Sequence, residues 1–179
     1  METNKNVIRL FNAIRGFNEM VDLEEQKFIK GEVAERVVLK TQLIYGLDKN
    51  MKNVTRIVEE LRKKDILADK QKYLSECSTK ERALLKEYAD KDEKGEVAVS
   101  EKGECCVPED KLEEFNAKIK ELSDEYNPII TELDKTWETI LAEEVDIEFY
   151  KIKEELLPEI IVKSDYLVFK ELIIDEVID

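Results

Sequence analysis

Apolar residues recur in alternating steps of three and four along two long stretches of this chain, residues 44–61 and 112–140. This spacing places them on one stripe of an α-helix, and a long apolar stripe needs another surface to cover it. The 179 residues include three prolines and five glycines, so few positions can end such helices. The pattern therefore predicts a mainly α fold built from long amphipathic helices.

The first stripe occupies a and d positions of a coiled-coil heptad over nearly three repeats. It consists of Ile44, Leu47, Met51, Val54, Val58 and Leu61. We expect this interaction seam to pack on the returning helix, on the terminal helices or on another subunit. In the same phase the next positions are Asp65, Ala68 and Lys72, and the apolar pattern resumes in a shifted phase at Leu74. The shift predicts a kink, a break between two helices or a change of packing partner near residues 62–73.

The second stripe predicts a helix that returns along the first. Its members are Leu112, Phe115, Ile119, Leu122, Tyr126, Ile129, Leu133 and Ile140, with Trp137 beside them. Pro108 followed by two acidic residues is typical of a helix start. Pro128 removes one backbone donor inside the pattern and predicts a kink near residues 124–127.

Between the two stripes, residues 91–108 alternate polar and apolar side chains around Gly103, which favours a β-hairpin. Further signals are Gly31 as a helix stop or a bend, Gly46 as a point of close approach to another helix and Ser164 as the cap of a last helix. We thus expect an elongated antiparallel helical hairpin with a small β-hairpin insertion and short packing helices. The predicted single domain, 1–179, divides into N-terminal short helices (1–31), a long arm with a break near 62–73 (32–90), the β-hairpin turn (91–108), the returning helix (109–142), and an extended segment with a C-terminal helix (143–179).

Composition excludes several functions. The net charge of -14 repels phosphate backbones, so direct nucleic-acid binding is not expected. The chain contains no histidine, which excludes Ser-His-Asp and Cys-His catalysis and imidazole metal ligands. No apolar run reaches the ~20 residues that span a bilayer, and the N-terminus lacks the order of a secretory signal peptide. We expect no enzyme activity, no cofactor and no membrane contact.

One segment resembles a calcium-binding loop. Asp90, Asp92 and Glu101 fall at positions one, three and twelve of that pattern. Lys94 stands at position five, where an oxygen ligand is needed, and the exit is β-like instead of helical. We interpret the segment as an acidic turn. Cys105 and Cys106 are adjacent and so poorly spaced for one metal ion, and with Cys77 they are expected to be reduced thiols.

Residues 84–179 resemble a family of small tailed-bacteriophage proteins of unknown function. The resemblance begins at a turn and a proline-led helix, carried by Tyr88, Lys91, Asp92, Gly95, Gly103, Pro108, Leu112, Phe115 and Asn116. It continues in a Val-Asp-Ile segment at 144–147 and a closing helix that starts at Ser164-Asp165-Tyr166-Leu167. Ala89 departs from the family, which has glycine after the tyrosine. The family carries no catalytic or ligand residues to transfer.

The resemblance implies a phage protein, located in the virion or in the cytoplasm of the infected host. With the helical stripes, it predicts a virion structural component or a neck or tail assembly factor that associates with other phage proteins, with itself, or with both. The alternative is an acidic inhibitor that mimics nucleic acid and binds a host or defence protein. A calcium-binding helical protein is the third hypothesis.

Overall fold

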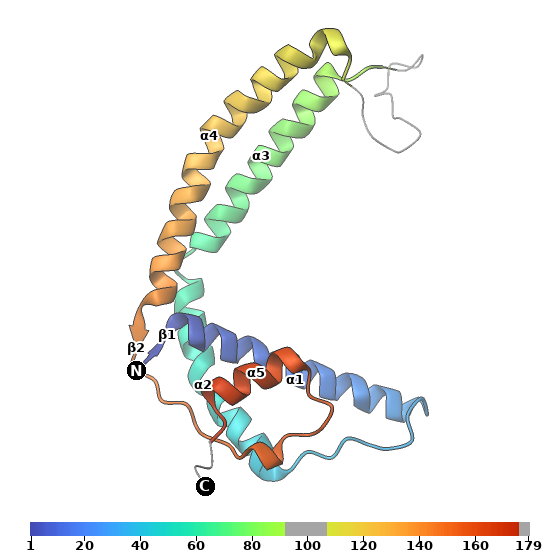
Figure 1. Cartoon of the computed structure of the whole chain (residues 1–179), viewed down its shortest axis with the longest axis vertical. Coiled ribbons are helices and arrows are strands. Elements are labelled where there is room, and N and C mark those ends of the chain that lie inside the picture. Colours follow the sequence, from blue (N-terminus) through green and yellow to red (C-terminus); the bar gives the residue numbers. More distant parts are fainter. Residues whose placement is uncertain (92–106, 176–179) are drawn as a thin grey trace. The chain divides into compact units, whose positions relative to one another are not determined.

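The computed structural model describes residues 1–91 and 107–175. Helices dominate the fold, and a two-stranded antiparallel sheet accompanies them, which confirms the mainly α class with a small β element (Figure 1). In chain order the elements are β1 (Glu2–Thr3), α1 (Asn4–Ile29), α2 (Thr41–Arg62), α3 (Ile66–Tyr88), α4 (Glu109–Ala142), β2 (Glu144–Val145), the 3-10 helix η1 (Glu154–Leu156) and α5 (Lys163–Leu172).

The sheet joins the start of the chain to the segment after α4, with Glu2 opposite Val145 and Thr3 opposite Glu144. The predicted β-hairpin falls almost entirely on residues 92–106, outside the described residues. By its internal contacts the chain divides into two compact units. Unit 1 comprises residues 1–64 and 139–179, and unit 2 comprises residues 65–138. The prediction that all 179 residues form one elongated domain stays a prediction.

Helix α1 is the centre of unit 1 and packs against both α2 and α5. Its apolar residues Val7, Leu10, Ile14 and Phe17 recur at helical spacing and are completely or almost completely buried. The Phe17 ring meets Phe169 of α5 edge-on, with ring centroids 6.0 Å apart. The segments predicted as two short helices therefore form one helix. It stops before Gly31, whose positive φ of 72° confirms that residue as the helix stop.

The predicted seam on α2 lies largely within the core of unit 1. Leu47, Val54, Val58 and Leu61 are buried, Met51 is half-buried and Ile44 is exposed. Residues that the seam left out complete the buried stripe: Leu43, Gly46, Asn50 and Ile57. Among the three partners predicted for the seam, a terminal helix, α1, covers this side of α2. The buried stripe is thus rotated slightly from the predicted one.

The phase shift in the sequence corresponds to a break between two helices. Helix α2 ends at Arg62 and α3 begins at Ile66. Between them Asp65 has a left-handed backbone, with φ of 54°. The packing partner changes at the same point, because α2 belongs to unit 1 and α3 to unit 2. Two of the three predicted explanations for the shift therefore hold together.

Gly46 admits a close neighbour, although the neighbour is extended chain and not a helix. A Cβ at this position would lie 2.4 Å from Cγ2 of Ile152. The Ile152 backbone pairs in parallel with the end of α5: its N–H donates to Ile173 O at 2.8 Å, and its carbonyl accepts from Asp175 N at 3.0 Å. The predicted extended segment after α4 thus begins with the short strand β2 (Glu144–Val145), and the chain beyond it follows α2.

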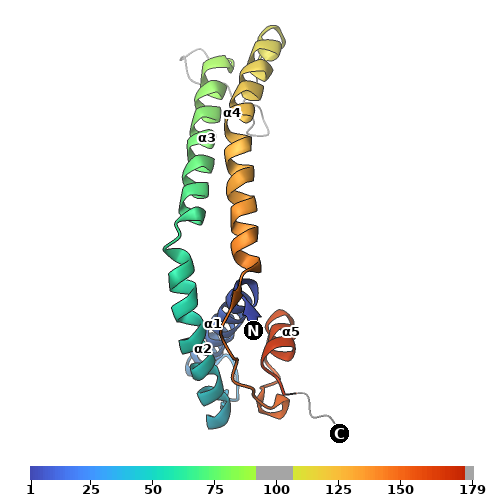
Figure 2. The ribbon, with the colours of Figure 1, turned by 90° about the vertical axis from the view of Figure 1, so that its left-hand side faces the viewer.

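Unit 2 is an antiparallel pair of helices, α3 and α4, which lie side by side in both views (Figures 1 and 2). Cross-helix contacts fix the direction, because residues later in α3 meet residues earlier in α4. The pairs are Lys70 with Asp134, Lys80 with Glu125, and Tyr88 with Phe115. Helix α4 continues through Pro128 as one helix. The antiparallel hairpin is thus present, with α3 and not α2 as the partner of α4.

Candidate interaction surface

The helices α3 and α4 bury few side chains between them. The buried apolar residues of unit 2 within the described ranges are Tyr88, Ala89, Leu122 and Tyr126. Edge-on ring contacts extend this seam, with Tyr73 6.4 Å from Tyr126 between ring centroids. The Tyr88 hydroxyl donates to Glu114 at 2.9 Å, and this hydrogen bond raises the pKa of Tyr88. A pair of helices 23 and 34 residues long therefore has a narrow core and two wide flanks.

One flank, the charged face, is covered by ion pairs. It contains a cavity of about 330 Å³ lined by Lys80, Ala83, Leu84, Glu87, Lys118, Glu121, Leu122 and Glu125. Lys80 Nζ lies 3.1 Å from Glu125 and 4.7 Å from the centre of the Tyr126 ring. Hydrogen bonds to Tyr126 and Glu125 raise the pKa of Lys80. Lys118 pairs with Glu121 at 3.0 Å. The Lys80–Glu125 pair thus crosses a solvent-exposed groove from α3 to α4, whereas the Lys118–Glu121 pair lies within α4.

The opposite flank, the low-charge face, carries a second series in steps of three and four on each helix. From α3 it comprises Leu67, Gln71, Leu74, Ser78, Glu81 and Leu85, and from α4 Leu112, Asn116, Ile119, Ser123, Asn127, Ile130, Asp134 and Trp137. Only two of these fourteen residues are charged, whereas 40% of all residues in the chain are charged. Asp134 forms an ion pair with Lys70, and a carboxylate oxygen of Glu81 accepts from the Cys77 thiol at 3.9 Å.

Helical geometry places both series on the same side of the hairpin. At 100° per residue, Leu67, Leu74 and Leu85 lie about 90° around α3 from the side that faces α4, which carries Tyr73 and Tyr88. Leu112 and Ile130 are displaced in the same rotational sense from Leu122 and Tyr126, the buried residues of α4. In an antiparallel pair of helices, displacements of the same rotational sense place residues on the same side of the pair. The residues of the charged face are displaced in the opposite sense on both helices and share one cavity, which is consistent with this placement.

The leucines of the low-charge face are accessible. Leu67 is 52% exposed, Leu74 40% and Leu112 38%. Leu85, Ile119, Ile130 and Trp137 are half-buried. Neighbouring apolar residues on a surface with few charges are typical of protein–protein contact sites. The sequence pattern indicated Leu112, Ile119 and Trp137 of α4 and Leu74 of α3, but as parts of packed helix stripes. It did not indicate Leu67 and Leu85, which the regular steps of three and four from Leu67 to Leu85 could have revealed.

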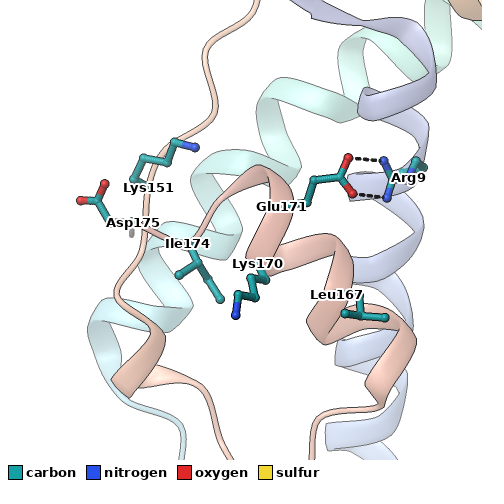
Figure 3. Close-up of a pocket in the computed structure, with 7 residues that line it drawn as sticks. All are labelled: Arg9, Lys151, Leu167, Lys170, Glu171, Ile174 and Asp175. Carbon is teal, nitrogen blue, oxygen red and sulfur yellow. Dashed lines mark hydrogen bonds and ion pairs between the residues drawn. The ribbon is translucent and has the colours of Figure 1, made fainter. Parts of the chain in front are cut away.

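A separate pocket of about 910 Å³ lies in unit 1 beside α1 and α5 (Figure 3). The Arg9 guanidinium donates two hydrogen bonds to the Glu171 carboxylate, at 2.8 and 2.6 Å. The hydrogen bond raises the pKa of Arg9 and lowers the pKa of Glu171. Lys151 Nζ donates to Leu172 O at 2.9 Å. Because these charges are engaged by groups of the chain itself, we interpret the pocket as part of the α1–α5 packing.

The calcium-like residues are only partly within the described chain. Asp90 is exposed at the end of α3, while Asp92 and Glu101 lie outside the described residues. Over residues 1–91 and 107–175, no group of three or more His, Cys, Asp and Glu side chains could hold a metal ion. Cys77 is a half-buried free thiol whose pKa is raised by burial and by Glu81. Cys105 and Cys106 lie outside the described ranges.

Comparison of the chain with protein-family models, with curated proteins and with solved structures finds no match. A search of the described helices finds none long and apolar enough to cross a membrane.

Proposed function

We propose that this protein is non-enzymatic and acts through helix-mediated association with other proteins. The observation that carries the proposal is the low-charge face, where the exposed Leu67 and Leu74 of α3 flank the Lys70–Asp134 ion pair, level with the half-buried Ile130 and Trp137 of α4. A two-helix hairpin with so narrow a core leaves apolar surface that a further helix can cover. The predicted seam on α2 serves this role less well, because four of its six residues are already buried in unit 1.

We further propose that the association takes place in a tailed bacteriophage, as a virion component or a neck or tail assembly factor. This setting rests on the resemblance of residues 84–179 to a phage family. The partners are then other phage proteins, a second copy of the chain, or both.

The test is quantitative mass spectrometry of purified phage particles. We expect the protein at a fixed copy number for each particle, retained after washing in high salt, because an apolar contact is weakly sensitive to ionic strength. A protein that is present in infected cells but absent from both particles and assembly intermediates would contradict the proposal.

A second candidate function, an acidic inhibitor of a host or defence protein, is supported by the outer side of α4. This side carries the exposed acids Asp110, Glu113, Asp124 and Glu138, with Lys120 and Lys135 between them. This excess of carboxylates, on a chain with a net charge of -14, can occupy a cationic nucleic-acid site. Early expression, absence from particles and capture of a nucleic-acid-binding host protein, released by moderate salt, would favour this candidate.

A further inference from the structure

We propose that the low-charge face binds the same face of a second copy of this chain, so that two α3–α4 hairpins form a four-helix bundle. The inference rests on the proposed function and names the partner in it. Two-fold association requires a surface that tolerates contact with itself. The face itself carries two charged residues, Glu81 and Asp134, and Asp134 is paired with Lys70, so the face carries little net charge.

Charge also disfavours the outer side of α4 as a self-contact. The chain carries a net charge of -14, and this side has four acids against two lysines. Two copies that met there would bring together more carboxylates than lysines, and like charges repel one another. On the low-charge face, serine, asparagine and glutamine lie between the leucines, and these side chains can donate and accept across an interface between identical chains.

The size of the face fits a stable dimer. A helix as long as α3 spans ~35 Å, and two helices side by side are ~20 Å wide. The face thus covers ~700 Å² on each copy, or ~1,400 Å² in total, within the range of specific protein–protein interfaces. A bundle of four antiparallel helices would convert each narrow two-helix core into a full one.

The experiment is sedimentation equilibrium of the full chain, combined with the fluorescence of Trp137 over a dilution series. Trp137 is the only tryptophan of the chain and belongs to the low-charge face. We expect a mass of twice 21.0 kDa at high concentration. As dilution separates the copies, the Trp137 emission should shift to longer wavelength at the concentration where the mass halves, because the ring becomes exposed to water.

Two variants and one matched control test the surface. Leu67→Glu and Leu74→Glu each place a carboxylate on the face of both copies, and we expect dissociation constants raised at least ~10-fold. Leu23→Glu is the control: Leu23 is 50% exposed on α1, close to the 52% of Leu67, and its substitution should leave the dimer intact. Circular dichroism checks that the helices persist. All three leucines are accessible in the single chain, so the substitutions leave its core unchanged.

A mass of 21.0 kDa at every concentration would overturn the inference. So would a dimer that both variants leave unchanged, or one whose dissociation does not alter the Trp137 emission. The native-chain measurements decide the matter even if a variant fails to fold. These outcomes can be told apart from failure of the proposed function. A monomer found at fixed copy number in particles would contradict only the proposed self-contact. A dimer absent from particles and assembly intermediates would contradict only the proposed structural role in a phage.

Discussion

At the residue scale, two buried asparagines and one glycine join segments that are far apart in sequence. Asn4 donates through its backbone N–H to Glu143 O at 3.0 Å and through Nδ2 to Ile140 O at 2.8 Å. Glu143 O lies just beyond α4, and Ile140 O in its last turn also accepts from Glu143 N at 3.3 Å, so Asn4 holds the start of α1 to the end of α4. Asn50 is fully buried and pairs with both backbone groups of Tyr150, in the manner of a neighbouring strand.

Asn50→Ala should lower the free energy of unfolding by about 2–4 kcal/mol, because both backbone groups of Tyr150 lose a partner. In the native chain, Asn50 Nδ2 donates to Tyr150 O at 2.8 Å and Tyr150 N donates to Asn50 Oδ1 at 2.7 Å. Asn53 is exposed on the same helix, and Asn53→Ala is the matched control, with an expected effect below ~0.5 kcal/mol. Chemical denaturation measures both. Equal effects would show that the paired bonds do not stabilise the fold.

Gly46→Ala should destabilise unit 1 by about 1–3 kcal/mol, although alanine normally favours helix. The added Cβ would approach Cγ2 of Ile152 at 2.4 Å, and Ile152 is itself buried. Gly16→Ala offers the comparison, since its nearest neighbour is a carboxylate oxygen of Asp165 at 3.2 Å. We expect Gly16→Ala to melt at a higher temperature than Gly46→Ala. The reverse order would mean that Ile152 can move away at little cost.

At the element scale, α1 is held to α5 by an apolar contact and by one ion pair at the surface. Phe17 and Phe169 supply the buried part. Arg9 and Glu171 supply the polar part: both oxygens of the Glu171 carboxylate accept hydrogen bonds from the Arg9 guanidinium. Their side chains are 35% and 53% exposed, so solvent screens the pair and its contribution is small beside that of the aromatic contact.

Glu171→Gln should lower stability at neutral pH by less than ~1 kcal/mol. The hydrogen bond from Arg9 lowers the pKa of Glu171, so its stabilisation is present above the ordinary pKa of 4.5 and disappears as pH falls through the lowered value. The difference between native and variant proteins should therefore shrink toward zero in acid. Thermal melting from pH 7 to pH 3 measures it. The control, Glu19→Gln, removes the pair between Arg15 and Glu19 within α1, and a similar pH profile there would contradict a specific role of the α1–α5 pair.

At the scale of the whole molecule, unit 2 is inserted between the two parts of unit 1, residues 1–64 and 139–179. Each unit has buried residues of its own: Val7, Leu10 and Phe169 in unit 1, for example, and Leu122 and Tyr126 in unit 2. We therefore expect that a destabilising substitution in the core of one unit leaves the other unit folded.

Leu122→Asp places an unpaired charge in the narrow core of unit 2 and should destabilise that unit by about 3 kcal/mol or more. Hydrogen exchange measured by mass spectrometry should show lost protection along α3 and the unit 2 part of α4, with protection retained in α1 and α5. Ala117→Asp puts the same residue on the exposed side of α4 and serves as the control. Loss of protection throughout the chain would show that the units unfold together.

Much of the fold was accessible from the sequence because helical spacing is a local signal. It predicted the helix over 109–142, which matches α4 (Glu109–Ala142), the break near 62–73 and the stop at Gly31. It did not predict that Asn50 is buried, because a polar residue on an apolar stripe signals nothing without its distant partner Tyr150. The expected Ser164 cap was also wrong: α5 begins at Lys163, and its N-cap residue is Val162.

The sequence by itself determined that this chain forms long amphipathic helices and where most of them end. The spacing of apolar residues and the backbone preferences of glycine and proline act within one or two helical turns. The tertiary structure decided which side of each helix is buried: the α2 stripe runs through Leu43 and Asn50 instead of Ile44 and Met51. It also decided that α4 pairs with α3 and that residues 146–153 follow α2 past Gly46. Those choices depend on contacts between distant residues, such as Asn50 and Tyr150, which are 100 positions apart, and no local pattern records them.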